Sequence, residues 1–313
     1  MTNRLLLLFA LLGLALTAAG QSAVSSGRLE LLPAFPSKFV PPRSVEVWLP
    51  EGYVAGQRYP VLYMHDGQNL FDPKAASYGM AWEVDSVLAR LNQAGQTRPC
   101  IVVGISNTSR RFQEYTPAKP YAALPAATRA RLELERSGPP LSDDYLRFVV
   151  QELKPYIDQH YRTRPRRADT FIAGSSMGGL ISLYALLEYP RVFGGAACLS
   201  THWPLSLKEN RPDFTTAMLA YLHQTLPRRR KPRLYFDYGT TTLDARYEPH
   251  QLRVDSLLQA HGYDAPYRLT RKYVGAAHNE TAWKRRFAVP ATFLLAPRQP
   301  VHQDTGNHPR KRQ

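Results

Sequence analysis

The sequence predicts an α/β protein built on one mostly parallel central sheet with helices on both faces. Three observations support this fold class. Short apolar runs rich in β-branched residues alternate with segments of helical periodicity from about residue 44 onward. The composition, 44% hydrophobic and 21% charged, supplies enough apolar material for one large core. Residues 171–180, FIAGSSMGGL, also place a G-x-S-x-G motif between a strand-like run and a helical pattern.

The expected elements follow one another in order along the chain. The strands are short apolar runs, at residues 44–49, 60–65, 100–105, 169–174, 195–200, 233–238 and 267–270. The helices are longer segments in which apolar residues recur at helical spacing, at residues 82–91, 143–160, 178–188, 213–226, 249–261 and 280–295. Because helices connect successive strands, the strands are expected to run mostly parallel.

The segment at residues 111–141 interrupts this alternation. It contains several aromatic residues and the prolines Pro117, Pro120, Pro125, Pro139 and Pro140. Such an excursion is expected near the carboxyl ends of the strands, where ligands bind in sheets of this kind. We interpret it as a loop that lines the substrate site, with an inert surface loop as the alternative.

The start of the chain is typical of an exported protein. Residues 5–16 are almost wholly apolar, follow Arg4 and lead into small residues at 18–20, so residues 1–20 are predicted to be a cleaved signal peptide. The apolar run is shorter than the roughly 20 residues that span a bilayer, so no membrane span is expected once the signal is removed. The protein is therefore expected in a periplasm or outside the cell.

The remaining chain is expected to form a single domain. Residues 21–40 are predicted to be a lead-in, residues 41–296 the α/β domain, and residues 297–313 a basic, disordered tail.

The chain is strongly basic, with a formal net charge of +15 at pH 7, or 15 − 1 = +14 without the single arginine of the predicted signal. Clusters of Lys and Arg at residues 162–167 and 228–233 fall in loops before predicted strands, and a third lies at 310–312 in the tail. They are not interleaved with aromatic residues as in a nucleic-acid groove. This pattern favours solvated loop charge, and no nucleic-acid partner is predicted.

The two cysteines, Cys100 and Cys198, each lie in a strand-like stretch. They are predicted to be small buried core residues, because disulfide frameworks and metal sites need closely spaced clusters. The sequence contains no H-E-x-x-H motif or comparable ligand cluster, so no metal site is predicted.

Ser176, at the centre of the G-x-S-x-G motif, is the predicted nucleophile. A serine hydroxyl needs a neighbouring base and a third group that orients this base. His278 follows the last predicted strand and opens on the same edge of the sheet, where the other histidines are less well placed. Asp244, in the loop beyond the strand at residues 233–238, is the preferred acid, and Asp237 inside that strand is the alternative.

Two backbone amides are expected to bind the negative charge that develops on the substrate oxygen. The amide of Met177, directly after the serine, supplies one donor. The other is expected in the loop after the strand at residues 60–65, where Gly67 permits an unusual turn and leaves the Gln68 amide as the candidate. An ordinary turn at the end of a strand is the alternative for this loop.

Five separated motifs carry a resemblance to a known family. They are YMHDGQNLFD at residues 63–72, WEVD at 82–85, GISN at 104–107 with EYTP at 114–117, GSSMGG at 174–179, and GAAHNE at 275–280 with Trp283. In these motifs, and over about residues 40–296, the chain resembles the putative-esterase branch of the α/β hydrolases. That branch includes feruloyl, acetyl-xylan and enterochelin esterases, esterase D and the mycolyltransferases.

The resemblance implies an α/β-hydrolase fold and hydrolysis of carboxylic esters without a cofactor. It also places Ser176 and His278 at matching motif positions. One departure concerns the acid, because relatives often carry it about three residues after the glycine that ends the seventh strand. This chain has Thr242 there, and Asp244 lies two residues further on.

Together these features predict a serine esterase that acts through an acyl-enzyme on an extracellular or periplasmic ester, such as an acylated carbohydrate or a siderophore-type ester. A non-catalytic carbohydrate- or partner-binding protein and an acyltransferase are the alternatives. Four aromatic residues, Trp82, Tyr115, Tyr121 and Trp203, either stack on the substrate or belong to the core. The acyl group, the alcohol and the oligomeric state stay open.

Overall fold

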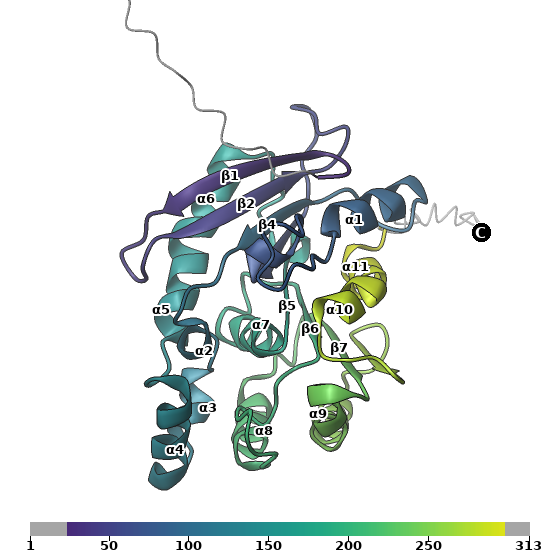
Figure 1. Cartoon of the computed structure of the whole chain (residues 1–313). Helices are drawn as coiled ribbons and strands as arrows, with labels where there is room; N and C mark the ends of the chain where they lie inside the picture. The colour runs from purple at the N-terminus through teal and green to yellow at the C-terminus, as the bar shows by residue number, and fades with distance from the viewer. Residues whose placement is uncertain (1–23, 298–313) are drawn as a thin grey trace, which may run out of the picture.

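The computed structural model describes residues 24–297, which form an eight-stranded sheet in the order β1-β2-β4-β3-β5-β6-β7-β8 (Figure 1). The strands are β1 (Arg28–Phe35), β2 (Arg43–Leu49), β3 (Val61–His65), β4 (Ile101–Ile105), β5 (Thr170–Ser175), β6 (Gly195–Leu199), β7 (Arg233–Gly239) and β8 (Arg268–Tyr273). Strands β3 to β8 pair in parallel. At one edge of the sheet, β2 pairs antiparallel with both of its neighbours, β1 and β4. The sheet is therefore mostly parallel, as predicted.

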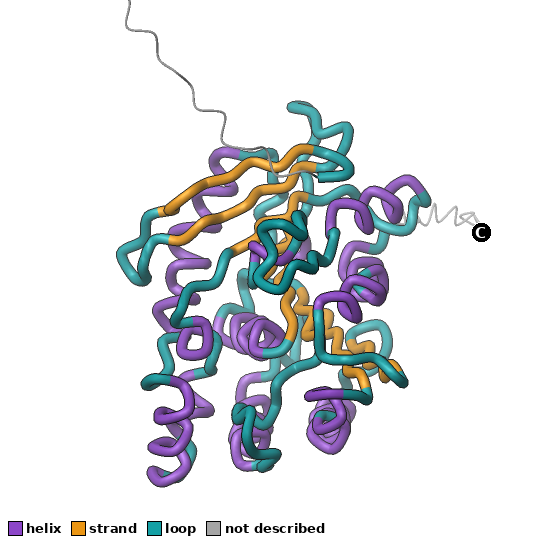
Figure 2. Tube along the Cα trace, in the orientation of Figure 1, coloured by secondary structure: helices purple, strands orange, loops and turns teal. Residues whose placement is uncertain are grey.

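Helices cover both faces of the sheet (Figure 2), and most of the parallel strands are connected through helices. They are α1 (Val84–Gln93), α2 (Arg111–Glu114), α3 (Ala118–Ala122), α4 (Ala126–Arg136), α5 (Ser142–Arg147), α6 (Lys154–His160), α7 (Met177–Glu188), α8 (Asp213–Thr225), α9 (Glu248–Ala260), α10 (Glu280–Arg286) and α11 (Ala288–Leu295), with a π-helical stretch at Phe148–Leu153 between α5 and α6. Helices α1, α10 and α11 pack on one face, and α5 to α9 pack on the other. This arrangement confirms the predicted α/β architecture.

Strand side chains alternate between two hydrophobic cores, because successive residues of a strand point to opposite faces. In β5, Phe171 and Ala173 belong to the core beneath α1 and α11, whereas Ile172 belongs to the core beneath α7. All residues of β5 are buried. A parallel strand covered on both faces reads as a continuous apolar run, and this is why the sequence reveals it.

Strand β1 lies where the sequence predicts only a lead-in. It pairs antiparallel with β2, and the register shifts between Leu32 and Phe35, around Pro33 and Ala34. Much of β1 is exposed or half-buried. A short edge strand that contains a proline has little apolar pattern, so the prediction, which starts near residue 44, omits it.

Prolines mark helix boundaries in two segments that differ from the expectation. Residues 111–141 form helices α2, α3 and α4, and Pro117 and Pro125 directly precede α3 and α4. A proline is compatible with a helix start, because the first amides of a helix have no intrahelical partner. The last expected helix is divided into α10 and α11 at Phe287, since Pro290 cannot donate to the carbonyl of Arg286 four residues earlier.

The predicted signal at residues 1–20, and the predicted tail apart from Pro297, lie outside the described residues. Within residues 24–297 no helix has the length and apolar character needed to cross a membrane. The same residues hold no group of three or more histidine, cysteine or acidic side chains suited to a metal ion. Cys100 and Cys198 are free and buried, which confirms their predicted place in the core.

Candidate active site

Ser176 stands on a strained turn between β5 and α7. Its backbone has φ 57° and ψ −120°, a conformation that is costly for any residue except glycine. Close packing requires a glycine two residues before it, because a Cβ added to Gly174 would lie 2.7 Å from the carbonyl carbon of Gly178. The G-x-S-x-G motif therefore forms the sharp strand-to-helix turn that the sequence predicts.

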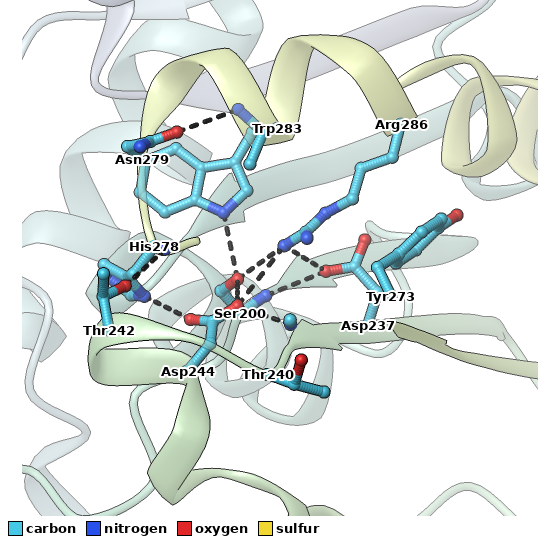
Figure 3. A network of polar contacts seen from close by, with 12 residues as sticks. Ser200, Asp237, Thr240, Thr242, Asp244, Tyr273, His278, Asn279, Trp283 and Arg286 are labelled. Carbon is cyan, nitrogen blue, oxygen red and sulfur yellow. Dashed lines mark hydrogen bonds and ion pairs between the residues drawn. The ribbon is translucent and has the colours of Figure 1, made fainter. Parts of the chain in front are cut away.

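His278 and Asp244 meet beyond the carboxyl ends of the last two strands. His278 lies in the loop between β8 and α10, and Asp244 lies in the 3-10 turn Thr242–Arg246 after β7. The Nδ1 atom of His278 is 2.6 Å from Oδ1 of Asp244 (Figure 3). Because an ionised carboxylate only accepts hydrogen bonds, Nδ1 carries the hydrogen and Nε2 is left as a base.

The Asp244 carboxylate is fully enclosed and receives three hydrogen bonds. Besides His278, the Ser200 hydroxyl and the Gly239 amide donate to its Oδ2, each at 2.6 Å. Burial by itself raises the pKa of this carboxyl, but the hydrogen bonds from His278, Ser200 and Gly239 outweigh burial and hold the pKa below its usual value. Asp244 is therefore ionised at neutral pH.

Asp237, the alternative acid, has a different set of partners. Its Oδ1 lies 3.0 Å from Nη2 of Arg286 and accepts a hydrogen bond from the Ser200 amide at 3.1 Å. Burial raises the pKa of Asp237 to about 6, and the Arg286 cation opposes this shift. Of the two acids that the sequence leaves open, Asp244 is the one that contacts His278.

The turn that carries Asp244 also holds the backbone of the histidine. Thr242 accepts a hydrogen bond through Oγ1 from the His278 amide at 2.8 Å. The rings of Tyr247 and Trp283 confine the imidazole further, edge to face, with centroid distances of 5.7 and 5.0 Å. His278 is therefore fixed at both its backbone and its side chain.

Ser176 and His278 line one cavity of about 590 Å³. Asp66, Arg111 and Glu280 also line it. The guanidinium of Arg111 binds both carboxylate oxygens of Asp66, at 2.6 and 2.7 Å, so these two charges balance. Glu280 has no ion-pair partner within residues 24–297, and burial raises the pKa of its carboxyl. The lining of the cavity therefore includes a carboxyl that forms no ion pair among the described residues.

Ser176 has two further neighbours that the sequence does not indicate. Within residues 24–297 no hydrogen bond joins Ser176 to His278. The Ser176 side chain contacts the hydroxyl of Tyr247, which is 2.7 Å from Nδ1 of His202. The His202 amide donates to the Ser176 carbonyl at 3.2 Å. Contacts with Tyr247 and His202 therefore stabilise the strained turn at Ser176.

The two predicted oxyanion donors flank the cavity. Met177 opens α7 directly after Ser176, so its amide precedes the first hydrogen-bonded turn of the helix. Gln68 lies in the 3-10 turn Gly67–Asn69 after β3, between Asp66 and Asn69, which both line the cavity. Asp66, Asn69 and Ser176, which are close to Gln68 and Met177 in the sequence, line the cavity. The side chains of Gln68 and Met177 themselves do not.

Gly67 is needed for a reason other than the one the sequence indicates. The left-handed residue of this turn is Asp66, with φ 58°, and not Gly67. A Cβ added to Gly67 would lie 2.6 Å from the carbonyl carbon of Gly104 and 2.7 Å from the amide nitrogen of Ile105. The glycine therefore allows the turn to pack against the backbone of β4.

Replacing Gly67 with alanine is expected to lower both thermal stability and ester turnover. The overlap with the β4 backbone has to be relieved by a shift of the Gln68 turn, at a cost of about 1–3 kcal/mol. Thermal unfolding and kcat/KM for a p-nitrophenyl ester measure the two effects. Gly56→Ala is the matched control, because a Cβ added there meets nothing within 4 Å. Equal behaviour of the two variants would contradict the packing argument.

The aromatic residues considered as a stacking surface belong to the core. Their exposed fractions are 4% for Trp82, 0% for Tyr115, 5% for Tyr121 and 1% for Trp203. Tyr78, which is 72% exposed, and Phe112 line the cavity instead. Arg111 and Phe112 open the proline-rich segment, so the prediction that this segment lines the site holds for its first residues.

Several site residues are not identified by the sequence analysis. Asp66 and Glu280 lie inside the motifs HDGQN and HNE, so their position in these motifs could have identified them. Ser200 and Arg286 carry no such signal, because their places in the site come from packing between elements that are far apart in the chain.

Comparison with known proteins finds relatives among esterases. A stretch of 161 residues is 29% identical to the ferri-bacillibactin esterase BesA of Bacillus subtilis (strain 168), covering 48% of this chain and 52% of BesA. The chain spans about half the length of the first curated relatives it matches.

Solved structures show the same fold. A ferulic acid esterase is similar with a TM-score of 0.63 at 18% identity, covering 86% of this chain and 98% of that one. An IroE-like serine hydrolase from Shewanella oneidensis is similar with a TM-score of 0.62 at 21% identity, covering 85% and 78%. These likenesses, together with the sheet order and the turn at Ser176, show an α/β-hydrolase fold. The model of the family described as "Putative esterase" matches residues 38–293, which is most of the chain. The chain therefore belongs to the putative esterase family.

Proposed function

We propose that this protein is a serine carboxylic-ester hydrolase with Ser176, His278 and Asp244 as its catalytic triad. The observation that carries the proposal is the 2.6 Å contact between His278 and the enclosed Asp244 carboxylate, beside a cavity that Ser176 also lines. Family membership and the esterase relatives support the same class of reaction.

In the proposed reaction the Ser176 hydroxyl attacks the ester carbonyl while Nε2 of His278 takes its proton. Asp244 keeps the imidazole in the required tautomer and stabilises the positive charge that it acquires. The amides of Met177 and Gln68 bind the oxyanion, and loss of one such donor typically costs about 2.7–4 kcal/mol. His278 then protonates the leaving alcohol, and water activated by His278 hydrolyses the acyl-enzyme.

The proposed substrate is an ester rich in hydroxyl groups, either an acylated carbohydrate or a siderophore-type ester. A cavity of about 590 Å³ is the size of a typical small-molecule site. Glu280 accepts hydrogen bonds from hydroxyl groups of the substrate and disfavours a substrate carboxylate, since it forms no ion pair within residues 24–297. The relatives' names refer to ferri-bacillibactin and to ferulic acid esters. The signal predicted at residues 1–20 would place the enzyme in a periplasm or outside the cell.

Covalent labelling with a fluorophosphonate tests this proposal directly. We expect the reagent to modify the peptide that contains Ser176, because displacement of its fluoride needs an activated serine hydroxyl. Acetyl, feruloyl and trilactone esters form the matching substrate panel. Absence of both label and hydrolysis would indicate a non-catalytic binding protein on the same fold. Transfer of the acyl group to an added alcohol, with little release of free acid, would indicate an acyltransferase.

A further inference from the structure

Arg286 is a buried cation directly behind the proposed triad acid. Its side chain is 3% exposed, and its Nη2 lies 3.0 Å from Oδ1 of Asp237 and 3.7 Å from Oδ2 of Asp244 (Figure 3). The guanidinium carbon is 5.1 Å from the centre of the Tyr273 ring. Burying a cation is costly unless nearby anions compensate it. The placement of Arg286 is therefore tied to these two carboxylates.

Ser200 connects Arg286 to Asp244. Its hydroxyl oxygen lies 2.6 Å from Nη2 of Arg286, 3.0 Å from Nε1 of Trp283 and 2.6 Å from Oδ2 of Asp244. The guanidinium and the indole N–H can only donate, so they occupy both lone pairs of the hydroxyl oxygen. The single hydrogen of the hydroxyl therefore has to point at Asp244.

The backbone at Ser200 is strained, as expected of a residue held in place for a specific task. Its φ is 44°, in the left-handed region that residues other than glycine seldom adopt. The Ser200 amide donates to the carbonyl of Asp237 at 2.9 Å and to its Oδ1 at 3.1 Å. The surrounding contacts thus impose the conformation that aims the hydroxyl at Asp244.

The charges of this cluster fit the protonation change that the proposed mechanism requires. At neutral pH, Asp237 and Asp244 face one cation, so the cluster carries one net negative charge. When His278 takes a proton, the group as a whole becomes neutral. Without Arg286, two buried carboxylates would share Ser200, and such like charges favour protonation of one of them.

We infer that Arg286, acting through the Ser200 hydroxyl, is a positioning residue that keeps Asp244 ionised and aimed at His278. This inference rests on the proposed triad and explains how Asp244 is held in place. Other titratable groups face this cluster: Tyr235 and Tyr273 lie beside Asp237 and Arg286, and Tyr247, Arg246, His202 and Glu280 surround Asp244 and His278.

Arg286→Met, which keeps much of the side-chain volume without the charge, tests the inference. We expect the acid limb of kcat/KM against pH to move to higher pH by about one unit, so that activity at about pH 5.5 relative to about pH 8 falls about tenfold. The sign follows because loss of the cation lets the carboxylates bind protons at higher pH, and a protonated Asp244 no longer accepts from Nδ1. Arg286→Lys should restore most of the profile. Arg285→Met, at an exposed position of the same helix, is the control and should leave the profile unchanged.

A double variant separates positioning from simple charge balance. If Arg286 serves only to balance Asp237, then Arg286→Met combined with Asp237→Asn regains the wild-type pH profile, and the inference is overturned. Under the inference the profile stays displaced, because Ser200 still lacks one of its two donors. A wild-type profile in Arg286→Met alone also overturns it.

Ser200→Ala answers the same question if the arginine variants do not fold. If the acid limb of kcat/KM against pH moves to higher pH in this variant, the result supports a role for the Ser200 hydroxyl between Arg286 and Asp244. An unchanged acid limb contradicts that role. The proposed function is tested separately by Ser176→Ala. Retention of activity in this variant would overturn the triad itself. An inactive Ser176→Ala together with an unshifted Arg286→Met overturns only the role of Arg286.

Discussion

Ser176→Ala is expected to lower kcat for a p-nitrophenyl ester by about 10⁶-fold, while the remaining rate stays about 10³–10⁴-fold above that in water. The alanine variant has no nucleophile to form an acyl-enzyme, whereas the cavity and the backbone amides still bind the substrate. Initial rates over a range of ester concentrations measure the effect, and KM should change far less than kcat.

An exposed serine provides the matched control for this measurement. Ser256 lies on α9 and its hydroxyl donates to the Leu252 carbonyl, away from the cavity residues. Ser256→Ala should therefore retain wild-type kcat. Circular dichroism and thermal unfolding of both variants show whether the fold is preserved. Activity of Ser176→Ala within about tenfold of the wild type would remove Ser176 from the mechanism.

Asp244→Asn is expected to lower kcat by about 10⁴-fold with little change in structure. An amide at this position can donate to Nδ1 of His278, which leaves the ring hydrogen on Nε2, where the base is needed. The variant therefore stabilises the wrong tautomer. Steady-state kinetics at a pH near 8 give the effect without interference from carboxyl protonation.

Asp237→Asn is the informative comparison, because it changes the other buried acid in the same way. Asp237 contacts Arg286 and Ser200 rather than the histidine. Its replacement should therefore lower kcat by about tenfold or less at the same pH. Equal losses in the two variants would show that the acid of the triad cannot be assigned from the 2.6 Å contact alone.

The parts of this fold and site that can be predicted from the sequence depend on local patterns. Strand β5 is buried along its whole length and reads as an apolar run, and Gly174 is required by its close contact with the backbone of Gly178, four residues later. The predicted sheet, the strand-to-helix turn and the loop position of His278 all depend on such short-range features. These are the parts that the structure reproduces.

The rest depends on packing between distant segments. Whether Asp237 or Asp244 reaches the histidine depends on the 3-10 turn after β7, in which Thr242 adopts a φ of 53° that no local pattern reveals. Ser200 and Arg286 meet although they are 86 residues apart in the chain. The aromatic residues Trp82 and Tyr115 are equally compatible with a core and with a binding surface until their neighbours are known.

His278 donates two hydrogen bonds to the Thr242–Arg246 turn, one from its backbone amide to Thr242 and one from Nδ1 to Asp244. The proposed base and acid therefore sit on one tethered part of the cavity lining. The same cavity is also lined by Tyr78, Met80 and Phe112, of which Tyr78 and Met80 are solvent-exposed. Substitutions there can alter which esters are accepted while the chemical step is left intact, and this gives the scaffold room to diversify its substrates.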